Sequence, residues 1–185
     1  MRGDTRFSAF LCLPAWISGL LVLTLVLGAP ACKSTPQVDP LTEALTAYKT
    51  AVEPALAKNE ELSKIFVQLV NEGQGKIDSD AAAKRLESEL LPKAKEFSDL
   101  VNTIQVTDPQ VQALHEVLVK VAKLRLEGYQ QVVTAYNSKM MDQFTEGRTK
   151  LKESKIMEED EFAAKLIPLM ASHGLELTLF ATPAL

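Results

Sequence analysis

The chain has 185 residues, 46% of them hydrophobic and 24% charged, and its 24 acidic side chains outnumber its 20 basic ones. Residues 1–31 hold two of the basic and one of the acidic side chains, so the remaining 154 residues carry a net charge of −5. This balance argues against nucleic acid and against adhesion to anionic lipid, because both partners require a basic surface. The aliphatic content excludes a disordered tail and suffices for one domain with a core.

The N-terminal segment has the three-part layout of a secretory signal. Arg2 and Arg6 form a basic start, and the 25 residues from Phe7 to Ala31 contain no charge. The most apolar stretch, Leu20–Leu27, precedes the small residues Gly28–Ala31. Such a run partitions into the membrane while the arginines stay on the cytoplasmic side. We therefore predict that residues 1–31 are a signal peptide and do not belong to the fold.

Cys32 follows this segment directly, in the sequence Ala29-Pro30-Ala31-Cys32. The segment resembles the signal of bacterial lipoproteins, in which a lipobox ends in a cysteine. The resemblance implies cleavage after Ala31, diacylation of the Cys32 thiol and acylation of the new amine. It departs from the usual lipobox, which prefers Leu three residues before the cysteine, and Pro30 is unusual there. Lys33 is not the Asp associated with inner-membrane retention in enterobacterial lipoproteins, which favours the outer membrane.

The cysteine count fits acylation. The other cysteine, Cys12, lies inside the leader, so the mature chain cannot form an internal disulfide. Two alternatives remain open: Ala29-x-Ala31 is also an ordinary cleavage site that would release a soluble secreted or periplasmic protein, and the uncharged run is long enough to span a bilayer uncleaved. Residues 32–38 are polar after the cysteine, and we expect them to be an extended tether.

The body, residues 39–175, repeats apolar side chains at steps of three and four, which predicts an all-α fold. The first and third helices begin with Asp39-Pro40 and Asp108-Pro109, an acidic N-cap followed by proline at the first helical position. The first helix carries a heptad seam and should end at Gly73 and Gly75. The third should run to about Asn137, and its apolar pattern is the broadest of the four.

The second and fourth helices have less regular signals. The second should be capped by Asp78, Ser79 or Asp80 and reach Ile104. The fourth should run from Met141 to near Gly174, and a charged stretch at 152–161 leaves its continuity open.

Short connections make neighbouring helices antiparallel, which predicts an up-down-up-down antiparallel four-helix bundle. The expected organisation is a signal peptide at 1–31, a tether at 32–38, the bundle at 39–175 and a C-terminal tail at 176–185. Pro54, Pro92 and Pro168 fall inside helical patterns, where proline removes a hydrogen bond. Kinks at Pro54 and Pro92 would lie at nearly one level and could open a pocket; alternatively, the helices curve around each other without any ligand.

No motif indicates a metal, haem or cofactor, and we expect none. His115 and His173 should lie far apart along the third and fourth helices, and Val119 stands where an HExxH motif needs its second histidine. A C-x-x-C-H motif is missing, and Gln112 and Met170 stand three residues before the histidines, where a di-iron bundle needs glutamate. We interpret both histidines as helix-end or surface residues.

Several polar side chains interrupt the apolar patterns. Asn59 lies on the heptad seam of the first helix, where one polar residue can fix the register. Arg125 interrupts the third helix at the level of Glu89, and we predict a structural contact between Arg125 and Glu89. Tyr129 and Tyr136 are interpreted as core or rim residues. The acidic pairs and runs, Glu60-Glu61 and residues 158–161, are interpreted as solvated faces.

These patterns favour a lipid-anchored cell-envelope protein whose helical body is a non-catalytic binding or structural module. Its partners would be the membrane, through the lipid on Cys32, and a protein of the envelope. One alternative is a periplasmic carrier of a small ligand or haem in the bundle core. A hydrolase would need His115 beside a serine and a carboxylate. A secreted inhibitor or immunity-type protein would need an exposed apolar stripe, for which the third helix is a candidate if it is not simply buried.

Overall fold

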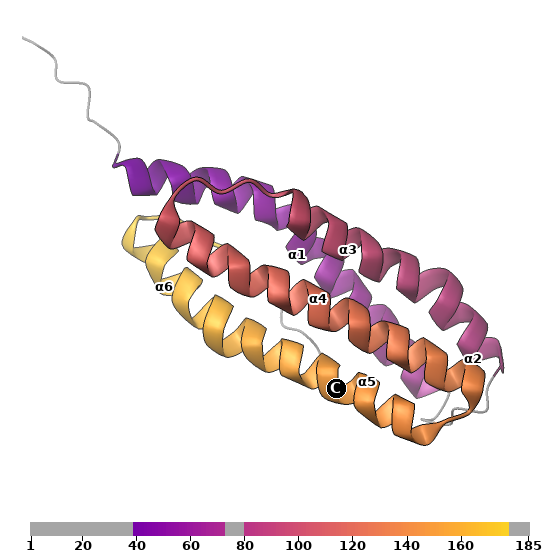
Figure 1. The fold of residues 1–185 in the computed structure, drawn as a ribbon. Helices are drawn as coiled ribbons and strands as arrows, with labels where there is room; N and C mark the ends of the chain where they lie inside the picture. The colour runs from indigo at the N-terminus through magenta and orange to yellow at the C-terminus, as the bar shows by residue number, and fades with distance from the viewer. Residues whose placement is uncertain (1–38, 73–79, 178–185) are drawn as a thin grey trace, which may run out of the picture. The chain divides into compact units, whose positions relative to one another are not determined.

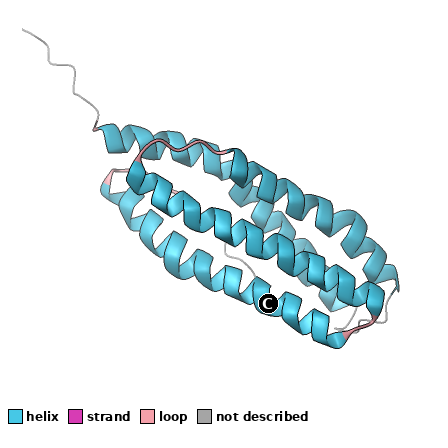
Figure 2. Cartoon of the chain, viewed as in Figure 1, coloured by secondary structure: helices cyan, strands magenta, loops and turns pink. Residues whose placement is uncertain are grey.

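The computed structural model describes residues 39–72 and 80–177, which are helical and contain no strand (Figure 2). All of them belong to one compact unit, Gln37–Leu185. The predictions for the leader, the cleavage site at Ala31, Cys32, the tether and the turn at Gly73 and Gly75 lie outside the described residues. None of the helices in the described ranges is long and apolar enough to cross a membrane.

Within these ranges the chain forms four helical rods (Figure 1). The first and third are single α-helices, and a π-helical segment interrupts each of the others. The first rod is α1 (Pro40–Glu72); the second is α2 (Asp80–Arg85), η1 (Leu86–Leu90) and α3 (Leu91–Thr103); the third is α4 (Pro109–Ser138); the fourth is α5 (Met141–Ile156), η2 (Met157–Ala163) and α6 (Ala164–Ser172). The all-α prediction is confirmed, and the fourth rod is helical throughout its length.

The helix ends follow from the capping chemistry of the sequence. The Asp108 carboxylate accepts hydrogen bonds from the backbone N–H of Gln110 (2.9 Å) and Val111 (3.0 Å), which confirms the predicted start of α4. Lys139 ends α4 in the left-handed conformation, with φ 58°. Gly174 ends α6 in the same region, with φ 70°, and the Leu175 N–H then reaches the Met170 carbonyl at 2.9 Å. The third and fourth rods are therefore stopped by local backbone chemistry.

The three prolines inside the helical patterns are all exposed. Pro54 lies within the continuous helix α1, Pro92 follows η1, and Pro168 lies in α6 beyond η2. Water can satisfy the carbonyl groups that a proline leaves without a partner on an exposed face, and π turns are a recognised way to absorb such irregularity. The prolines therefore shape the rods at their outer surfaces.

One continuous core fills the space between the rods, and α4 contributes most to it. Tyr129 and Tyr136 are 3% and 0% exposed, which confirms their interpretation as core residues. The broad apolar face of α4 is buried, so it is not an exposed docking stripe.

The most extensive contact between two helices in the described ranges is between α4 and α5, which lie side by side (Figure 1). Gly128 of α4 and Gly147 of α5 face each other there. A Cβ atom added to Gly147 would lie 2.8 Å from the Gly128 carbonyl oxygen, whereas one added to Gly128 would first meet the Leu151 side chain at 2.9 Å. The two glycines therefore set the spacing of these helices.

Gly147→Ala should lower the free energy of unfolding by about 1–3 kcal/mol, because backbone must move to accept the methyl group. This loss should outweigh the gain of about 1 kcal/mol that alanine brings in helix propensity. Gly128→Ala should also be destabilising, since its methyl group would meet the buried Leu151 side chain at 2.9 Å and the Gly147 carbonyl oxygen at 3.0 Å. Chemical denaturation measures both variants; a Gly147→Ala variant as stable as the wild type would contradict this spacing.

Candidate functional site

A cluster of polar side chains is buried where α1, α4 and η2 meet. It consists of Asn59 and Ser63 from α1, Arg125 and Tyr129 from α4, and Glu158 from η2, and each is at most 7% exposed. We call it the polar cluster. It is the largest departure from an apolar interior among the described residues, and it is therefore the first candidate for a functional site.

Three members of the cluster form a closed hydrogen-bonded triangle. The Arg125 guanidinium donates to both oxygens of the Glu158 carboxylate, from Nη2 to Oε2 at 2.5 Å and from Nη1 to Oε1 at 3.4 Å. The Asn59 amide nitrogen donates to Glu158 Oε1 at 2.9 Å, and its amide oxygen accepts from Arg125 Nη1. Asn59 thus bridges the two charges, and every group in the triangle has a partner of the required kind.

Tyr129 and Ser63 close the cluster on one side. The Ser63 hydroxyl donates to the Asn59 backbone carbonyl at 3.1 Å, and the Tyr129 ring packs edge-on against Phe66 with centroids 5.4 Å apart. Burial raises the pKa of Tyr129 to about 12, so its hydroxyl stays protonated at neutral pH. The cluster is therefore enclosed by apolar and neutral groups, and no position in it is open to a substrate.

The sequence patterns do not single out two members of the cluster, Ser63 and Glu158. Glu158 begins the acidic run at 158–161, for which we predict a solvated face. That prediction is confirmed for the other three residues, which are exposed, and wrong for Glu158. Glu158 lies seven residues after Leu151 and four before Phe162, and both of these are buried. A heptad count through Leu151 would therefore have placed Glu158 on the inner face.

The predicted contact between Arg125 and Glu89 is wrong. Glu89 is bound by its neighbour Arg85 one turn earlier, with Nε to Oε1 at 2.9 Å and Nη2 to Oε2 at 3.2 Å. The prediction matched the two residues by their height along adjacent rods. Height does not fix the direction of a side chain around its helix axis, and Arg125 points toward α1 and η2 instead.

His115 is buried in the core, so its interpretation as a helix-end or surface residue is wrong. Its ring meets that of Tyr48 edge-on, with centroids 5.7 Å apart and Nδ1 3.4 Å from the Tyr48 hydroxyl. Burial lowers the pKa of His115, and the nearby Glu116 opposes this only in part. Burial also disfavours the charged form of Tyr48, which raises the pKa of its hydroxyl. The pair is neutral near pH 7 and holds α4 against α1.

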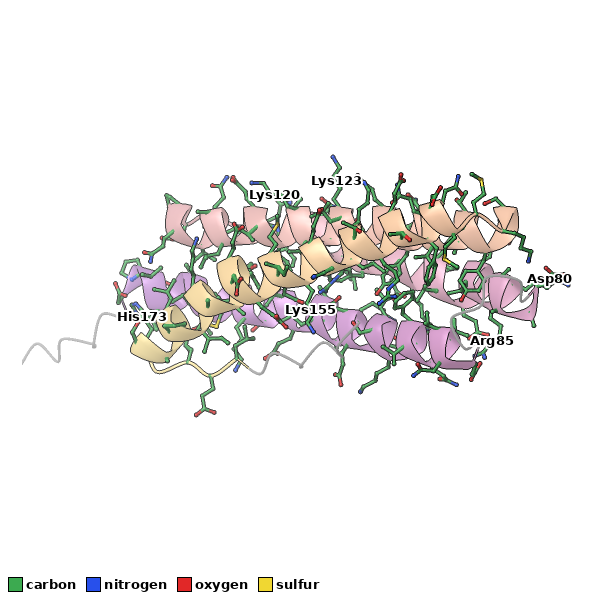
Figure 3. The ribbon with its side chains drawn as sticks, turned by 90° about the horizontal axis from the view of Figure 1, so that it is seen from below. Asp80, Arg85, Lys120, Lys123, Lys155 and His173 are labelled. Atoms are coloured by element: carbon green, nitrogen blue, oxygen red, sulfur yellow. The ribbon has the colours of Figure 1, made fainter. Side chains whose placement is uncertain are left out.

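His173 lies at the end of α6, as predicted, beside the start of α1 (Figure 3). Its Nδ1 atom is 2.8 Å from the Thr42 hydroxyl and 3.3 Å from an Asp39 carboxylate oxygen. A catalytic triad needs the hydroxyl and the carboxylate on different ring nitrogens. Here both face the same nitrogen, so the arrangement ties the first rod to the fourth and is not catalytic machinery.

Other chemistry proposed from the sequence finds no site in the described part of the chain. No group of three or more His, Cys, Asp or Glu there could hold a metal ion. Pro92 lines two open surface grooves. One groove lies along α3, and the other lies between α3 and α4, where Leu126 and Gln130 border it. Pro54 borders neither groove. The prolines therefore favour the alternative in which curved helices pack without enclosing a ligand.

Comparisons of the chain with protein families, with curated proteins and with solved structures find no match.

Arg125→Met should lower the free energy of unfolding by about 3–5 kcal/mol, because it leaves the Glu158 carboxylate buried without its counter-charge. Glu89→Gln is the control, and it should leave the stability nearly unchanged because its ion pair with Arg85 is on the surface. Urea denaturation followed by circular dichroism measures both. Equal effects of the two substitutions would contradict the assignment of the buried pair.

The lowered pKa of His115 predicts an acid-sensitive fold. Below its ordinary pKa of about 6.5 the unfolded chain binds a proton at this histidine, whereas the folded chain does not until a lower pH. The stability from neutral His115 is thus present above pH 6.5 and lost as the pH falls through the folded-state pKa. Between pH 7.5 and 5.5, the free energy of unfolding of His115→Gln should fall less than that of the wild type; parallel curves would contradict this.

Proposed function

We propose that the protein is a lipid-anchored component of the bacterial cell envelope and that its helical body is a non-catalytic binding or structural module. The observation that carries the proposal is Cys32. It is the single cysteine after the leader, and it follows directly on a run of 25 uncharged residues. Two or more acyl chains at this position would hold the protein stably on a membrane, since each buried methylene adds about 0.8 kcal/mol.

The start of the helical body suits such an anchor. α1 begins at Pro40, eight residues after Cys32. An extended chain covers about 3.3–3.6 Å per residue, so the body would stand within about 30 Å of the acylated residue. We infer a tether at 32–38 that leaves the body close to the lipid surface. Lys33 favours the outer membrane by the enterobacterial sorting pattern.

We also propose that the rods form an up-down-up-down antiparallel four-helix bundle. Only residues 104–108 separate α3 from α4, and only residues 139 and 140 separate α4 from α5, and such short connections favour antiparallel neighbours. The contact of His173 with Asp39 supports this order, because it joins the start of the first rod to the end of the fourth. The polar cluster joins the middles of the first, third and fourth rods, as this order requires.

The chemistry of the buried groups supports a module rather than an enzyme. The charges of the polar cluster satisfy each other, and the two histidines contact Tyr48 and Thr42 in arrangements that hold helices together. Buried polar networks of this kind are retained where they fix a unique packing. The body is thus suited to present a rigid surface.

Native mass spectrometry of the protein extracted gently from its own membranes tests the anchor. The expected result is a chain that begins at Cys32 and carries two or three acyl chains. The Cys32→Ser variant is the matched control and should lack the acyl mass and the cleavage at Ala31. A bare chain beginning at Cys32 in the soluble fraction would contradict the anchor and favour a secreted protein. An additional bound mass on the wild type would favour the carrier alternative.

A further inference from the structure

The large hydrophobic side chains that the described residues leave most exposed gather on the fourth rod. They are Met140, Met141, Ile156 and Ile167, which are 49%, 52%, 48% and 42% exposed. Met140 directly precedes the fourth rod and the other three lie on it. A single exposed apolar residue needs no explanation, but several along one rod define a candidate interaction surface.

Most of this surface is a single helix face. Met141, Arg148, Lys152 and Ile156 follow each other at steps of seven, four and four residues, which places them on one side of a helix. With Glu159 they border one open groove along α5. The inner side of α5 packs on α4 through buried residues such as Leu151. Phe144 is also buried but borders the groove, with the Arg148 guanidinium 5.9 Å from the centroid of its ring.

The face continues past η2 to α6. Asp160 and Ile167 are exposed there, whereas Phe162, Leu166 and Met170 are fully buried. Ile167 comes eleven residues after Ile156, about three helical turns. We call the exposed face the outer stripe: Met141, Arg148, Lys152, Ile156, Glu159, Asp160 and Ile167.

The charges of the outer stripe are divided by sign along its length. Arg148 and Lys152 lie in its first half, and Glu159 and Asp160 lie in its second half. No ion pair joins Arg148, Lys152 or Asp160 to another described residue. Lys155 also borders the groove and pairs with Glu159, from Nζ to Oε1 at 3.7 Å. The basic residues of the face therefore precede the acidic ones, and reversing the direction sets basic residues opposite acidic ones.

We propose that the outer stripe pairs with the same stripe of a second copy of this chain, antiparallel and about a two-fold axis at the level of Ser154. Met141 and Ile167 are equally far from residue 154, and so are Arg148 and Asp160. Met141 then meets the partner's Ile167, and Arg148 meets the partner's Asp160. Two-fold symmetry makes every contact twice, as in an isologous interface.

The same features disfavour the other occupants of an exposed helix face. An anionic lipid surface would attract the basic half of the stripe and repel Glu159 and Asp160. Residues 178–185 of the chain itself contain no charged side chain, so they would leave the charged side chains of the stripe unmatched. A second copy supplies an acidic residue opposite Arg148 and an apolar residue opposite Met141, while the aliphatic part of Lys152 lies opposite Ile156.

The size of the stripe sets the strength of the pairing. The 26 steps from Met141 to Ile167 correspond to about 39 Å at 1.5 Å per residue, and a helix face about 10 Å wide gives roughly 400 Å² per copy. Stable interfaces bury about 800 Å² per partner, so the dimer should be weak and reversible. Confinement to a membrane would raise the local concentration, but the pairing itself does not depend on acylation of Cys32.

Charge reversal tests the pairing in the full chain, purified from membranes in mild detergent. Native mass spectrometry over a concentration series measures the Kd for dimer formation. Arg148→Glu and Asp160→Lys should each weaken the dimer at least about tenfold, because each places two pairs of like charges opposite one another. The combination R148E/D160K should restore the Kd to within about threefold of the wild type. Lys123→Glu, on the outward side of α4 (Figure 3), is the matched control and should change nothing.

Thr149→Lys gives a second, independent test. Thr149 and Glu159 are equally far from residue 154, so the new lysine should pair with the partner's Glu159 and tighten the dimer at least about threefold. Thermal unfolding by circular dichroism checks that each variant folds.

Three results would overturn the proposal: a wild type that stays monomeric to about 1 mM, single reversals that leave the Kd unchanged, or a double reversal that fails to restore it. A monomer that binds anionic vesicles through Arg148 would also overturn it, in favour of a lipid surface. The measured masses report acylation separately from dimer formation, so the anchor and the dimer can fail independently.

Discussion

Arg125 and Glu158 place two full charges in the interior of a helical protein, and the packing of three rods depends on keeping them together. Removing such charges from water costs several kcal/mol for each ion, and only a well-formed pair with further hydrogen bonds compensates for it. Asn59 supplies those bonds from the first rod. A shift of any one rod along its axis would separate donors from acceptors in a place that water does not reach. The triangle therefore fixes the axial register of α1, α4 and η2 relative to one another.

The irregular segment η2 is part of the same arrangement. Glu158 is its second residue, and the apolar residues that follow, Phe162 and Leu166, are fully buried. A π turn changes the rotation of the residues beyond it about the helix axis, and such turns are frequent where a side chain has a special role. Here the inner face of the fourth rod carries the charge pair and the core, and the outer face is exposed among the described residues. Such an exposed, charge-divided face would suit the binding or structural module proposed above.

Local signals in the sequence were sufficient for the helices. Asp108-Pro109 predicts the start of α4 because carboxylate capping and a fixed proline φ act within one turn. The heptad seam of α1 correctly singled out Asn59 as an unusual polar member. Arg125 was also recognised, but its partner was not, because the direction of a side chain around a helix depends on tertiary packing. Glu158 was hidden in an acidic run whose composition is typical of a solvated face.

The two histidines also differ in how far the sequence alone predicts their positions. His173 follows the last turn of α6, so its place at a helix end could be deduced from the sequence. The burial of His115 depends on Tyr48, 67 residues earlier, and no local pattern reports such a contact.

A double-mutant cycle between Arg125→Met and Glu158→Met tests most directly whether the buried pair governs the packing. The free energy of unfolding is measured by denaturation for the wild type, the two single variants and the double variant. If the pair fixes the register of the three rods, the double variant should be more stable than the less stable single variant. The coupling free energy between the two substitutions should be at least about 2 kcal/mol. Additive effects within about 0.5 kcal/mol would contradict the account, because they would mean that the two charges do not depend on each other.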